Sequence, residues 1–275
     1  MIRSMKIYSL LISAAVFLSN SAAFACPTVD GIPDYNCDGE VIISILGDSL
    51  VKGFGDTKNN NVGGYVLRAQ KKLPNVEILN LGELGLRTFE LFDLIDEKFV
   101  ADSRVIKSDY VILDLGRNDR WLFGTPAATY RNLKRASAQI KKAVTDITPD
   151  TPPLVITAVI MLPNRGSQGP WVKELDAIIL RGSTDKAPND LRFDLVSKRL
   201  LSTDQIHPTP KGYDALSTTF VKYLKKVLPK KVTKLHPDQD GDKLPDEFEL
   251  KLFGTDPALR DTDGNGISDF AEIFN

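Results

Sequence analysis

Cysteine, histidine and long apolar segments are scarce in this chain, whose 275 residues include two cysteines and two histidines. Cys26 and Cys37 predict one small disulfide loop near the N-terminus and no zinc or redox site, with two free thiols as the alternative. The sequence has no Gly-Lys-Ser/Thr phosphate loop and no Gly-x-Gly-x-x-Gly turn opening a helix, which disfavours nucleotide cofactors. With 42% hydrophobic and 26% charged residues, it is typical of a folded globular protein and excludes disordered and collagen-like classes.

The one long apolar run lies at the N-terminus. Arg3 and Lys6 precede apolar residues 7–18, and an Ala-Phe-Ala cleavage site ends at Ala25, which is the pattern of a secretory signal peptide. The run is shorter than the roughly 20 residues that span a bilayer, and no later segment is long and apolar enough. We therefore expect an exported protein, secreted or periplasmic. A lipid anchor on Cys26 is the alternative, disfavoured because no leucine stands three residues before it.

Charge divides the exported part into two modules. Residues 238–275 carry 11 acidic and 3 basic residues, a net charge of −8, whereas residues 26–237 carry 30 basic and 25 acidic ones, net +5. The basic stretch between them is interpreted as a solvated linker, so no nucleic-acid partner is predicted. The predicted parts are a signal peptide (1–25), a disulfide loop (26–40), a large domain (41–228), a linker (229–237) and an acidic module (238–275).

The large domain alternates short apolar runs with helix-like stretches. The predicted strands cover residues 41–46, 76–81, 110–115, 154–160 and 191–196. The predicted helices cover residues 63–73, 88–100, 126–147, 170–181 and 209–228. Strands without strict alternation are buried on both faces, and right-handed crossovers make them parallel, so we expect a three-layer α/β/α sandwich. Sites in such sheets form at the carboxyl ends of the strands.

Polar segments stand at the positions where that architecture places a site. Gly47-Asp48-Ser49-Leu50 follows the first predicted strand, Gly116-Arg117-Asn118-Asp119 follows the third, and Asp204-Gln205-Ile206-His207 precedes the last helix. A lone serine after a strand is usually a helix cap, but a serine with a neutral imidazole to take its proton is a nucleophile. The other histidine, His236, lies in the predicted linker, so His207 is the candidate base.

These segments resemble the motif blocks of the GDSL or SGNH hydrolases, in the family's order between residues 41 and 228. The resemblance implies a flavodoxin-like fold with Ser49 as nucleophile, His207 as general base and Asp204 as the carboxylate that orients the imidazole. It also implies an oxyanion hole built from the Ser49 N–H, the Gly85 N–H and the Asn118 amide, and no cofactor in catalysis.

Two of these motifs differ from known hydrolase patterns, the second block of the family and the serine frame of the α/β-hydrolases. The second block, residues 80–88, has one residue more than the family pattern before Thr88, so Gly82 is the alternative to Gly85 as the oxyanion glycine. The frame around the serine, Gly47-Asp48-Ser49-Leu50-Val51, lacks the second glycine of the Gly-x-Ser-x-Gly elbow and disfavours an α/β-hydrolase.

The acidic module contains two loops with the spacing of calcium ligands. Residues 261–272 have Asp or Asn at positions 1, 3 and 5, Gly266 at the sharp turn, Asp at 9 and Glu at 12, and residues 238–249 repeat the acidic offsets with Lys243 in place of the turn glycine. We therefore expect structural Ca²⁺, bound more strongly by the second loop. The candidate ligands are Asp238, Asp240, Asp242, Leu244, Asp246 and Glu249, and Asp261, Asp263, Asn265, Ile267, Asp269 and Glu272, with Leu244 and Ile267 offering carbonyls.

The module resembles bacterial thrombospondin type 3 repeats, with dockerins, which bind cohesin scaffolds, as the alternative. Because such small modules have little core of their own, we expect cation binding to be part of their folding. The C-terminal module is also the candidate site for a cell-surface or extracellular partner. Residues 34–39 also begin like a calcium loop, but position 12 falls on Ile45 inside the first predicted strand. We predict a polar turn tied by the disulfide there, and no metal.

Two functions of different class fit the sequence. The first is a secreted serine esterase that hydrolyses carboxylic esters of lipids, sugars or small alcohols through an acyl-enzyme, with a calcium-binding C-terminal module. The second is a surface binding, adhesion or scaffold-docking protein with a catalytically idle hydrolase-like domain. The complete set of Ser49, Asn118, Asp204 and His207 favours the enzyme.

Overall fold

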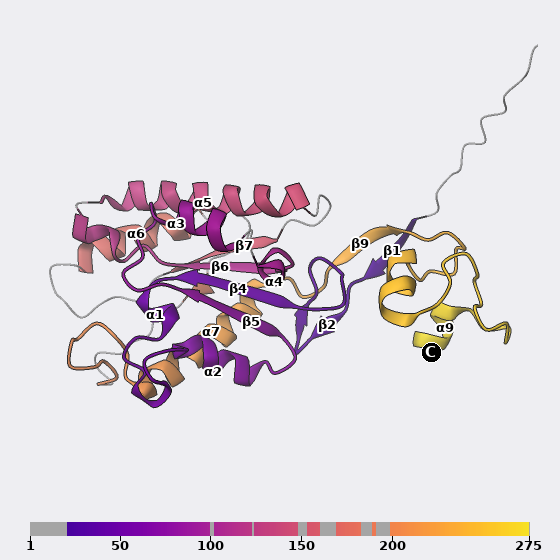
Figure 1. Cartoon of the computed structure of the whole chain (residues 1–275), viewed down its shortest axis with the longest axis horizontal. Coiled ribbons are helices and arrows are strands. Elements are labelled where there is room, and N and C mark those ends of the chain that lie inside the picture. The colour runs from indigo at the N-terminus through magenta and orange to yellow at the C-terminus, as the bar shows by residue number, and fades with distance from the viewer. Residues whose placement is uncertain are drawn as a thin grey trace, which may run out of the picture. The chain divides into compact units, whose positions relative to one another are not determined.

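The computed structural model divides the chain into two units (Figure 1). The larger unit spans Ala25–Thr233, and the smaller comprises Lys234–Asn275 with the N-terminal residues up to Phe24. The structure describes residues 21–99, 102–122, 124–147, 153–159, 169–182, 189–190 and 199–274. The basic start and apolar run of the predicted signal peptide lie outside these residues. No helix within the described part has the length and apolar character needed to cross a membrane.

A parallel sheet forms the centre of the larger unit. Its strand order is β5-β4-β6-β7-β8, and every neighbouring pair is parallel. Its strands are β4 (Ile42–Gly47), β5 (Glu77–Gly82), β6 (Tyr110–Asp114), β7 (Leu154–Val159) and β8 (Asn189–Asp190). The chain leaves β4 to one side for β5 and returns to the other side for β6, which makes the carboxyl end of β4 a topological switch point. The predicted α/β class with a parallel sheet is confirmed.

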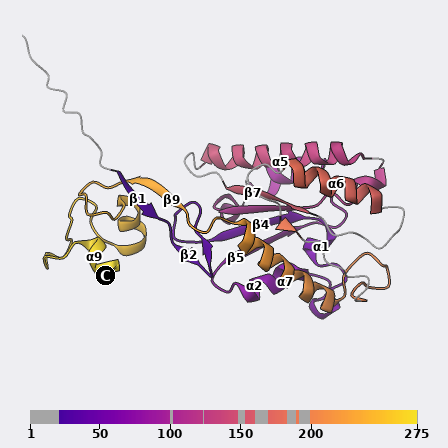
Figure 2. The same ribbon diagram turned by 180° about the vertical axis from the view of Figure 1, so that it is seen from behind.

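Helices cover both faces of this sheet (Figures 1 and 2). On one face α2 (Gly64–Lys72) and α7 (Pro210–Val227) pack against Ile43, Ile45 and Ile112. On the other, α5 (Pro126–Ile147) and α6 (Gly169–Gly182) pack against Leu46, Leu113 and Val155. All six residues of β4 are buried, which explains why the strand is apolar except for Ser44.

Of the predicted elements that the structure describes, all but one agree with it to within two residues. The fifth predicted strand, 191–196, lies outside the described residues and directly follows β8. The predicted helix over 88–100 is replaced by the short α3 (Leu91–Leu94) and a π-helix, η2 (Ile95–Phe99). The helical residues begin at Leu91, after Thr88, whose backbone N–H donates to Asp119 Oδ1 at 2.9 Å and whose hydroxyl donates to Asp119 Oδ2.

Short elements complete the two units. In the larger unit they are β2 (Thr28–Val29), β3 (Ile32–Pro33), α1 (Ser49–Lys52), η1 (Thr57–Asn59), α4 (Ser103–Ile106) and η3 (Asp119–Leu122). In the smaller unit they are α8 (Asp246–Phe248), η4 (Glu249–Phe253) and α9 (Asp269–Phe274). A two-stranded sheet joins β1 (Ser21–Ala25) to β9 (Thr233–Pro237).

The N-terminal segment forms the predicted disulfide between Cys26 and Cys37. Asp34 accepts hydrogen bonds from the backbone N–H groups of Cys37 (2.5 Å) and Gly39 (2.7 Å), which makes the polar turn. The buried Asp109 accepts from the backbone of Tyr35 at 2.6 Å and so ties this turn to the start of β6. Burial raises the pKa of Asp109 to about 8.

Candidate active site and metal-binding loops

Ser49 stands at the carboxyl end of β4, as the first residue of α1. Asp48 caps the helix by accepting a 3.0 Å hydrogen bond from the Leu50 backbone N–H. Gly47 must be glycine, because a Cβ there would lie 2.5 Å from the Asp114 carbonyl oxygen. The close approach of β4 to β6 therefore fixes the turn that carries Ser49.

The predicted nucleophile, base and orienting carboxylate form one hydrogen-bonded line. His207 Nε2 lies 2.9 Å from Ser49 Oγ, and His207 Nδ1 lies 2.6 Å from Asp204 Oδ2. Ser49 and His207 are 158 residues apart in the sequence, and the fold brings them together at the switch point. The first distance allows a serine hydroxyl to give its proton to an imidazole base, and the second is that of a carboxylate that orients the imidazole.

A tight turn holds the Asp204 carboxylate next to the His207 imidazole. Asp204 Oδ1 accepts from the backbone N–H groups of Ile206 (2.8 Å) and His207 (2.9 Å) and from the Ser202 hydroxyl (2.6 Å). Partial burial raises the pKa of Asp204, but the hydrogen bonds from Ser202 and His207 lower it well below its usual range. The carboxylate is therefore ionised wherever the protein is folded at ordinary pH.

Asn118 reaches the same site from the carboxyl end of β6. Its side-chain Nδ2 donates to the Leu86 carbonyl at 3.1 Å and lies 3.4 Å from Asp48 Oδ2. These contacts place an amide donor between the serine turn and the loop after β5.

The two candidate oxyanion glycines have different surroundings. Gly85 has a φ of +72°, lines the same cavity as Ser49, and has open space where a Cβ would be. Gly82 packs against α1, where a Cβ would lie 2.2 Å from the Lys52 backbone nitrogen. Gly85 therefore faces the cavity, and Gly82 is required for the packing of β5 against α1.

A buried charge network contacts Asp48 in the turn that carries Ser49, and the sequence analysis does not predict it. Arg117 donates to Asp48 at 2.8 Å and to Asp114, and the Tyr65 hydroxyl donates to Asp114 at 2.7 Å. Burial alone would lower the pKa of Arg117, but the charges of Asp114 and Asp48 raise it above its ordinary value. The sequence signal for this network is Asp114, a charged residue at the end of the otherwise apolar strand β6.

A cavity of about 330 Å³ opens beside the serine. Apart from the site residues, much of its lining is apolar and includes Leu50, Phe54, Leu84, Trp121 and Ile206. Phe54, Leu84 and Trp121 are 41%, 56% and 51% exposed. These three residues, called here the apolar rim, leave apolar surface in water beside the serine, as in sites that bind apolar ligands.

In the smaller unit, the two predicted calcium loops have the same backbone conformation. Gly241 and Gly264, at position 4, have φ values of 73° and 74°, and Lys243 and Gly266, at position 6, have φ values of 88° and 91°. In both loops the first aspartate accepts a 2.8 Å hydrogen bond from the fourth backbone N–H. Lys243 therefore adopts the left-handed turn that the sequence assigned to glycine.

The first loop gathers buried negative charge. Asp238, Asp240 and Asp242 each place a carboxylate oxygen within 4.8 Å of the others. Glu249 is 0% exposed, and among the described residues its Oε1 accepts from Thr255 at 3.2 Å while its Oε2 accepts no hydrogen bond. The pKa of Glu249 is raised to about 7, mainly by burial and to a smaller extent by the charge of Asp240. The three clustered aspartates fit a divalent cation, and the orphaned carboxylate oxygen of Glu249 is a further buried ligand atom in the same loop.

The second loop is more open. Glu272 is exposed and accepts a hydrogen bond from the side chain of Asn265, which is also exposed. The loops contact each other where the Phe270 backbone N–H donates to Asp242 Oδ2 at 2.7 Å. The second loop is thus tied to a predicted ligand position of the first.

Comparison with known proteins places the site in a family. The model of the GDSL-like lipase/acylhydrolase family matches residues 45–215. No curated protein matched the chain. Among solved structures, a lipolytic G-D-S-L family protein from Veillonella parvula is similar with a TM-score of 0.51 and 18% identity over 66% of this chain and 97% of that one.

Two further structures are similar over most of their length. The inhibitor-bound aryl esterase of M. smegmatis has a TM-score of 0.52 and 18% identity, covering 68% of this chain and 100% of that one. A psychrotrophic esterase of a Pseudoalteromonas species, inhibited by monoethylphosphonate, has a TM-score of 0.50 and 18% identity, covering 68% and 98%. At these identities the structures support the fold, whereas the family match spans the serine turn, the Asn118 segment and the histidine turn. The chain therefore belongs to the GDSL-like lipase/acylhydrolase family.

Proposed function

We propose that the larger unit is a serine esterase that hydrolyses carboxylic esters through an acyl-enzyme. The observation that carries this proposal is the hydrogen-bonded line from Asp204 through His207 to Ser49 at the edge of a cavity. A binding protein would have no need for a serine hydroxyl 2.9 Å from an imidazole that is itself held by an ionised carboxylate.

The geometry supports the following sequence of steps. His207 Nε2 takes the proton from Ser49 Oγ as the oxygen attacks the ester carbonyl, and Asp204 stabilises the imidazolium that forms. The imidazolium then gives this proton to the leaving alcohol, which leaves an acyl group on Ser49. A water molecule, deprotonated by His207, attacks the acyl-enzyme, and the acid is released with Ser49 restored.

The negative oxygen of each tetrahedral intermediate needs hydrogen-bond donors. We assign these to the backbone N–H groups of Ser49 and Gly85 and to the side chain of Asn118. The Asn118 amide nitrogen carries two protons, which it donates to the Leu86 carbonyl at 3.1 Å and to Asp48 Oδ2 at 3.4 Å. We expect the oxyanion to take the place of Asp48 in the longer of these two hydrogen bonds. A fixed donor of this kind is typically worth about 3 kcal/mol in the transition state.

Hydrolysis of p-nitrophenyl acetate by the purified chain tests the proposal. We expect steady turnover and covalent labelling by a fluorophosphonate on one serine. If a properly folded sample neither turns over the ester nor reacts with the probe, the domain is catalytically idle and the binding or adhesion function is favoured.

The apolar rim predicts a preference for esters with longer acyl chains. Each methylene moved from water into the cavity contributes about 0.8 kcal/mol, so kcat/KM should rise up to about fourfold per methylene from acetyl to hexanoyl p-nitrophenyl esters. Trp121→Ala should flatten this increase while changing acetyl ester hydrolysis little. Leu122→Ala is the matched control, because Leu122 follows Trp121 on η3 and is 55% exposed but is not part of the cavity lining. A profile that is flat in the wild type contradicts the preference.

We also propose that the acidic module binds Ca²⁺ and is related to thrombospondin type 3 repeats. The repeated loop conformation and the orphaned Glu249 oxygen support this proposal. Asp238, Asp240, Asp242 and Glu249 would hold the ion in the first loop, where it would neutralise the buried charge and stabilise the fold. The ligands lie outside residues 25–233, so we expect the ion to support the module and not the hydrolysis.

From the burial of Glu249 we expect the first loop to bind calcium more strongly than the second, which is the opposite of the order that the sequence favours. Glu249→Gln should weaken calcium binding more than Glu272→Gln, because Glu249 is the buried carboxylate and its loop contacts the other through Asp242. Calorimetric titration of the full chain with CaCl₂ measures this, with Glu247→Gln as a control outside the ligand positions. Equal or opposite losses would show that burial does not set the affinity. Chelation should leave p-nitrophenyl acetate hydrolysis nearly unchanged.

A further inference from the structure

We propose that Arg68 is a positioning residue for the catalytic histidine, acting through the segment Gly53–Asp56. This inference rests on the proposed esterase function. Arg68 lies on α2 and contacts neither Ser49 nor His207 in the hydrogen bonds described above. Its effect reaches His207 through the segment Gly53–Asp56, which contacts both the nucleophile and the base.

Gly53–Asp56 follows directly after α1 and joins the two reacting residues. The Phe54 backbone N–H donates to the Ser49 carbonyl at 2.9 Å. The Phe54 ring meets the His207 imidazole edge-on, with 4.7 Å between the ring centroids. The hydroxyl of Tyr213, on α7, donates to the Phe54 carbonyl at 2.6 Å. The segment is therefore bonded to the nucleophile on one side and packed on the base on the other.

Gly55 shows how closely the segment lies against the base. Its φ is +89°, and a Cβ there would be 3.2 Å from His207 Cβ and 3.0 Å from the Pro208 carbonyl oxygen. The segment has little room to move toward the histidine turn without displacing it. Movement away from that turn would remove the ring contact that holds the imidazole.

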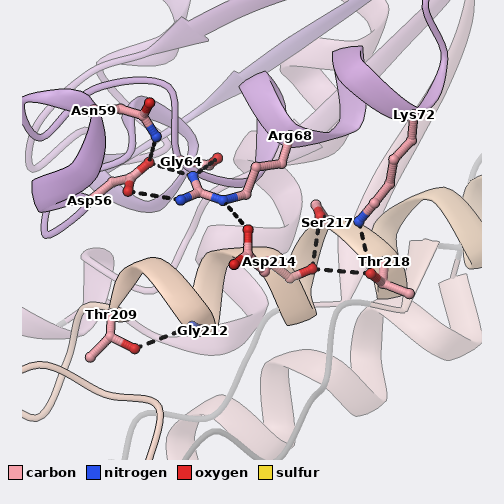
Figure 3. A network of polar contacts seen from close by, with 10 residues as sticks. All are labelled: Asp56, Asn59, Gly64, Arg68, Lys72, Thr209, Gly212, Asp214, Ser217 and Thr218. Atoms are coloured by element: carbon pink, nitrogen blue, oxygen red, sulfur yellow. Dashed lines mark hydrogen bonds and ion pairs between the residues drawn. The ribbon is translucent and has the colours of Figure 1, made fainter.

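Arg68 fixes the far end of this segment (Figure 3). Its guanidinium donates to both carboxylate oxygens of Asp56, one of them at 3.0 Å, and to the Gly64 carbonyl at 2.8 Å. Its Nε donates to Asp214 on α7 at 2.5 Å. Burial raises the pKa of Asp56, but the hydrogen bonds from Arg68 and Asn59 lower it below its ordinary value, so the pair is ionic.

Arg68 with its two partners, Asp56 and Asp214, is called here the clamp. The clamp can act on His207 through the segment Gly53–Asp56 and through α7. Asp56 is 0% exposed, so removing Arg68 leaves a buried carboxylate without its counter-charge and drives the segment toward water. Asp214 lies on the first turns of α7, which begins at Pro210, three residues after His207. Misplacement of a catalytic group by about 1 Å can cost about a hundredfold in rate.

The same two helices carry a second contact that serves as a control. Lys72, one turn beyond Arg68 on α2, donates to the hydroxyls of Ser217 (2.5 Å) and Thr218 (2.8 Å) on α7 (Figure 3). It joins α2 to α7 as Arg68 does, but at the end of α2 that is farther from Asp56. Lys72→Met thus removes a helix–helix contact and leaves the clamp in place.

The experiment compares Arg68→Ala, Arg68→Lys and Lys72→Met with the wild type. We measure kcat and KM for p-nitrophenyl acetate, the Tm, and the NMR signal of the His207 Nδ1–H proton, which is assigned with His236→Gln because the chain has only these two histidines. We expect Arg68→Ala to lower kcat by about 10- to 100-fold with KM changed less than about twofold, and to broaden the His207 signal. Arg68→Lys should recover part of kcat, and Lys72→Met should keep kcat and the signal whatever its Tm.

Two outcomes overturn the proposal. One is a folded Arg68→Ala protein with wild-type kcat and an unchanged His207 signal. The other is an equal loss of kcat in Lys72→Met, which would mean that general packing of α2 on α7 is responsible. If Arg68→Ala does not fold, Asp214→Asn decides, because it removes only the α7 arm of the clamp and should lower kcat less, again without a change in KM. A wild type without turnover refutes the esterase function itself, and the His207 signal then still tests the clamp.

Discussion

Replacing Ser49 by alanine is expected to lower kcat/KM for p-nitrophenyl acetate by about 10⁴- to 10⁶-fold, the usual cost of removing a serine nucleophile. The substitution removes the one oxygen that lies 2.9 Å from His207 Nε2. It should leave the fold intact, because the helix cap is provided by Asp48 and not by Ser49. The Tm should therefore stay close to that of the wild type.

Labelling by a fluorophosphonate separates loss of the nucleophile from loss of structure. The probe should react with the wild type and with Ser137→Ala, in which a buried serine of α5 is removed, but not with Ser49→Ala. Labelling that persists in Ser49→Ala, or activity within about tenfold of the wild type, would mean that a different residue attacks the ester.

The parts of this site that the sequence predicts are those with local physical causes. The turn that joins Asp204 to His207 depends on backbone N–H groups two and three residues after the carboxylate, so its spacing is visible in the sequence. The buried strand β4 is visible because its residues, apolar except for Ser44, suit a strand covered on both faces. Given parallel strands, the carboxyl ends must meet, and Ser49 and Asn118 are brought to the same edge.

The parts that the sequence does not predict depend on contacts between distant segments. The helical residues begin at Leu91 and not at residue 88, where the Thr88 backbone N–H donates to Asp119, 31 residues later. The different surroundings of the two candidate oxyanion glycines, with Gly82 packed on Lys52 and open space beside Gly85, cannot be seen from motif spacing. The burial of Glu249 likewise comes from packing within the smaller unit, and the sequence shows only its spacing.

The second large effect is expected from His207 and Asp204, and its size should be unequal. His207→Ala removes the base and should cost about as much as Ser49→Ala, because serine and histidine act as one unit. Asp204→Asn should cost less, about 10³- to 10⁴-fold. Its Oδ1 can still accept from the backbone of Ile206 and His207 and keep the turn. The amide NH₂ introduced by this substitution would donate to His207 Nδ1 and so favour the tautomer with the proton on Nε2. With that proton in place, Nε2 could not accept the proton of Ser49.

The double variant gives the sharpest test of how Asp204 acts. If Asp204 acts only by orienting and stabilising the imidazole, Asp204→Asn should cost little more once His207 is alanine, so the two losses in kcat should be far from additive. Ser202→Ala is the control for the turn, since it removes one hydrogen bond to Asp204 and leaves the bond to Nδ1. Additive losses would mean that Asp204 contacts the substrate or a water molecule directly. Because its side chain is 38% exposed, water has access to this carboxylate, and only the kinetics of the double variant separate the two roles.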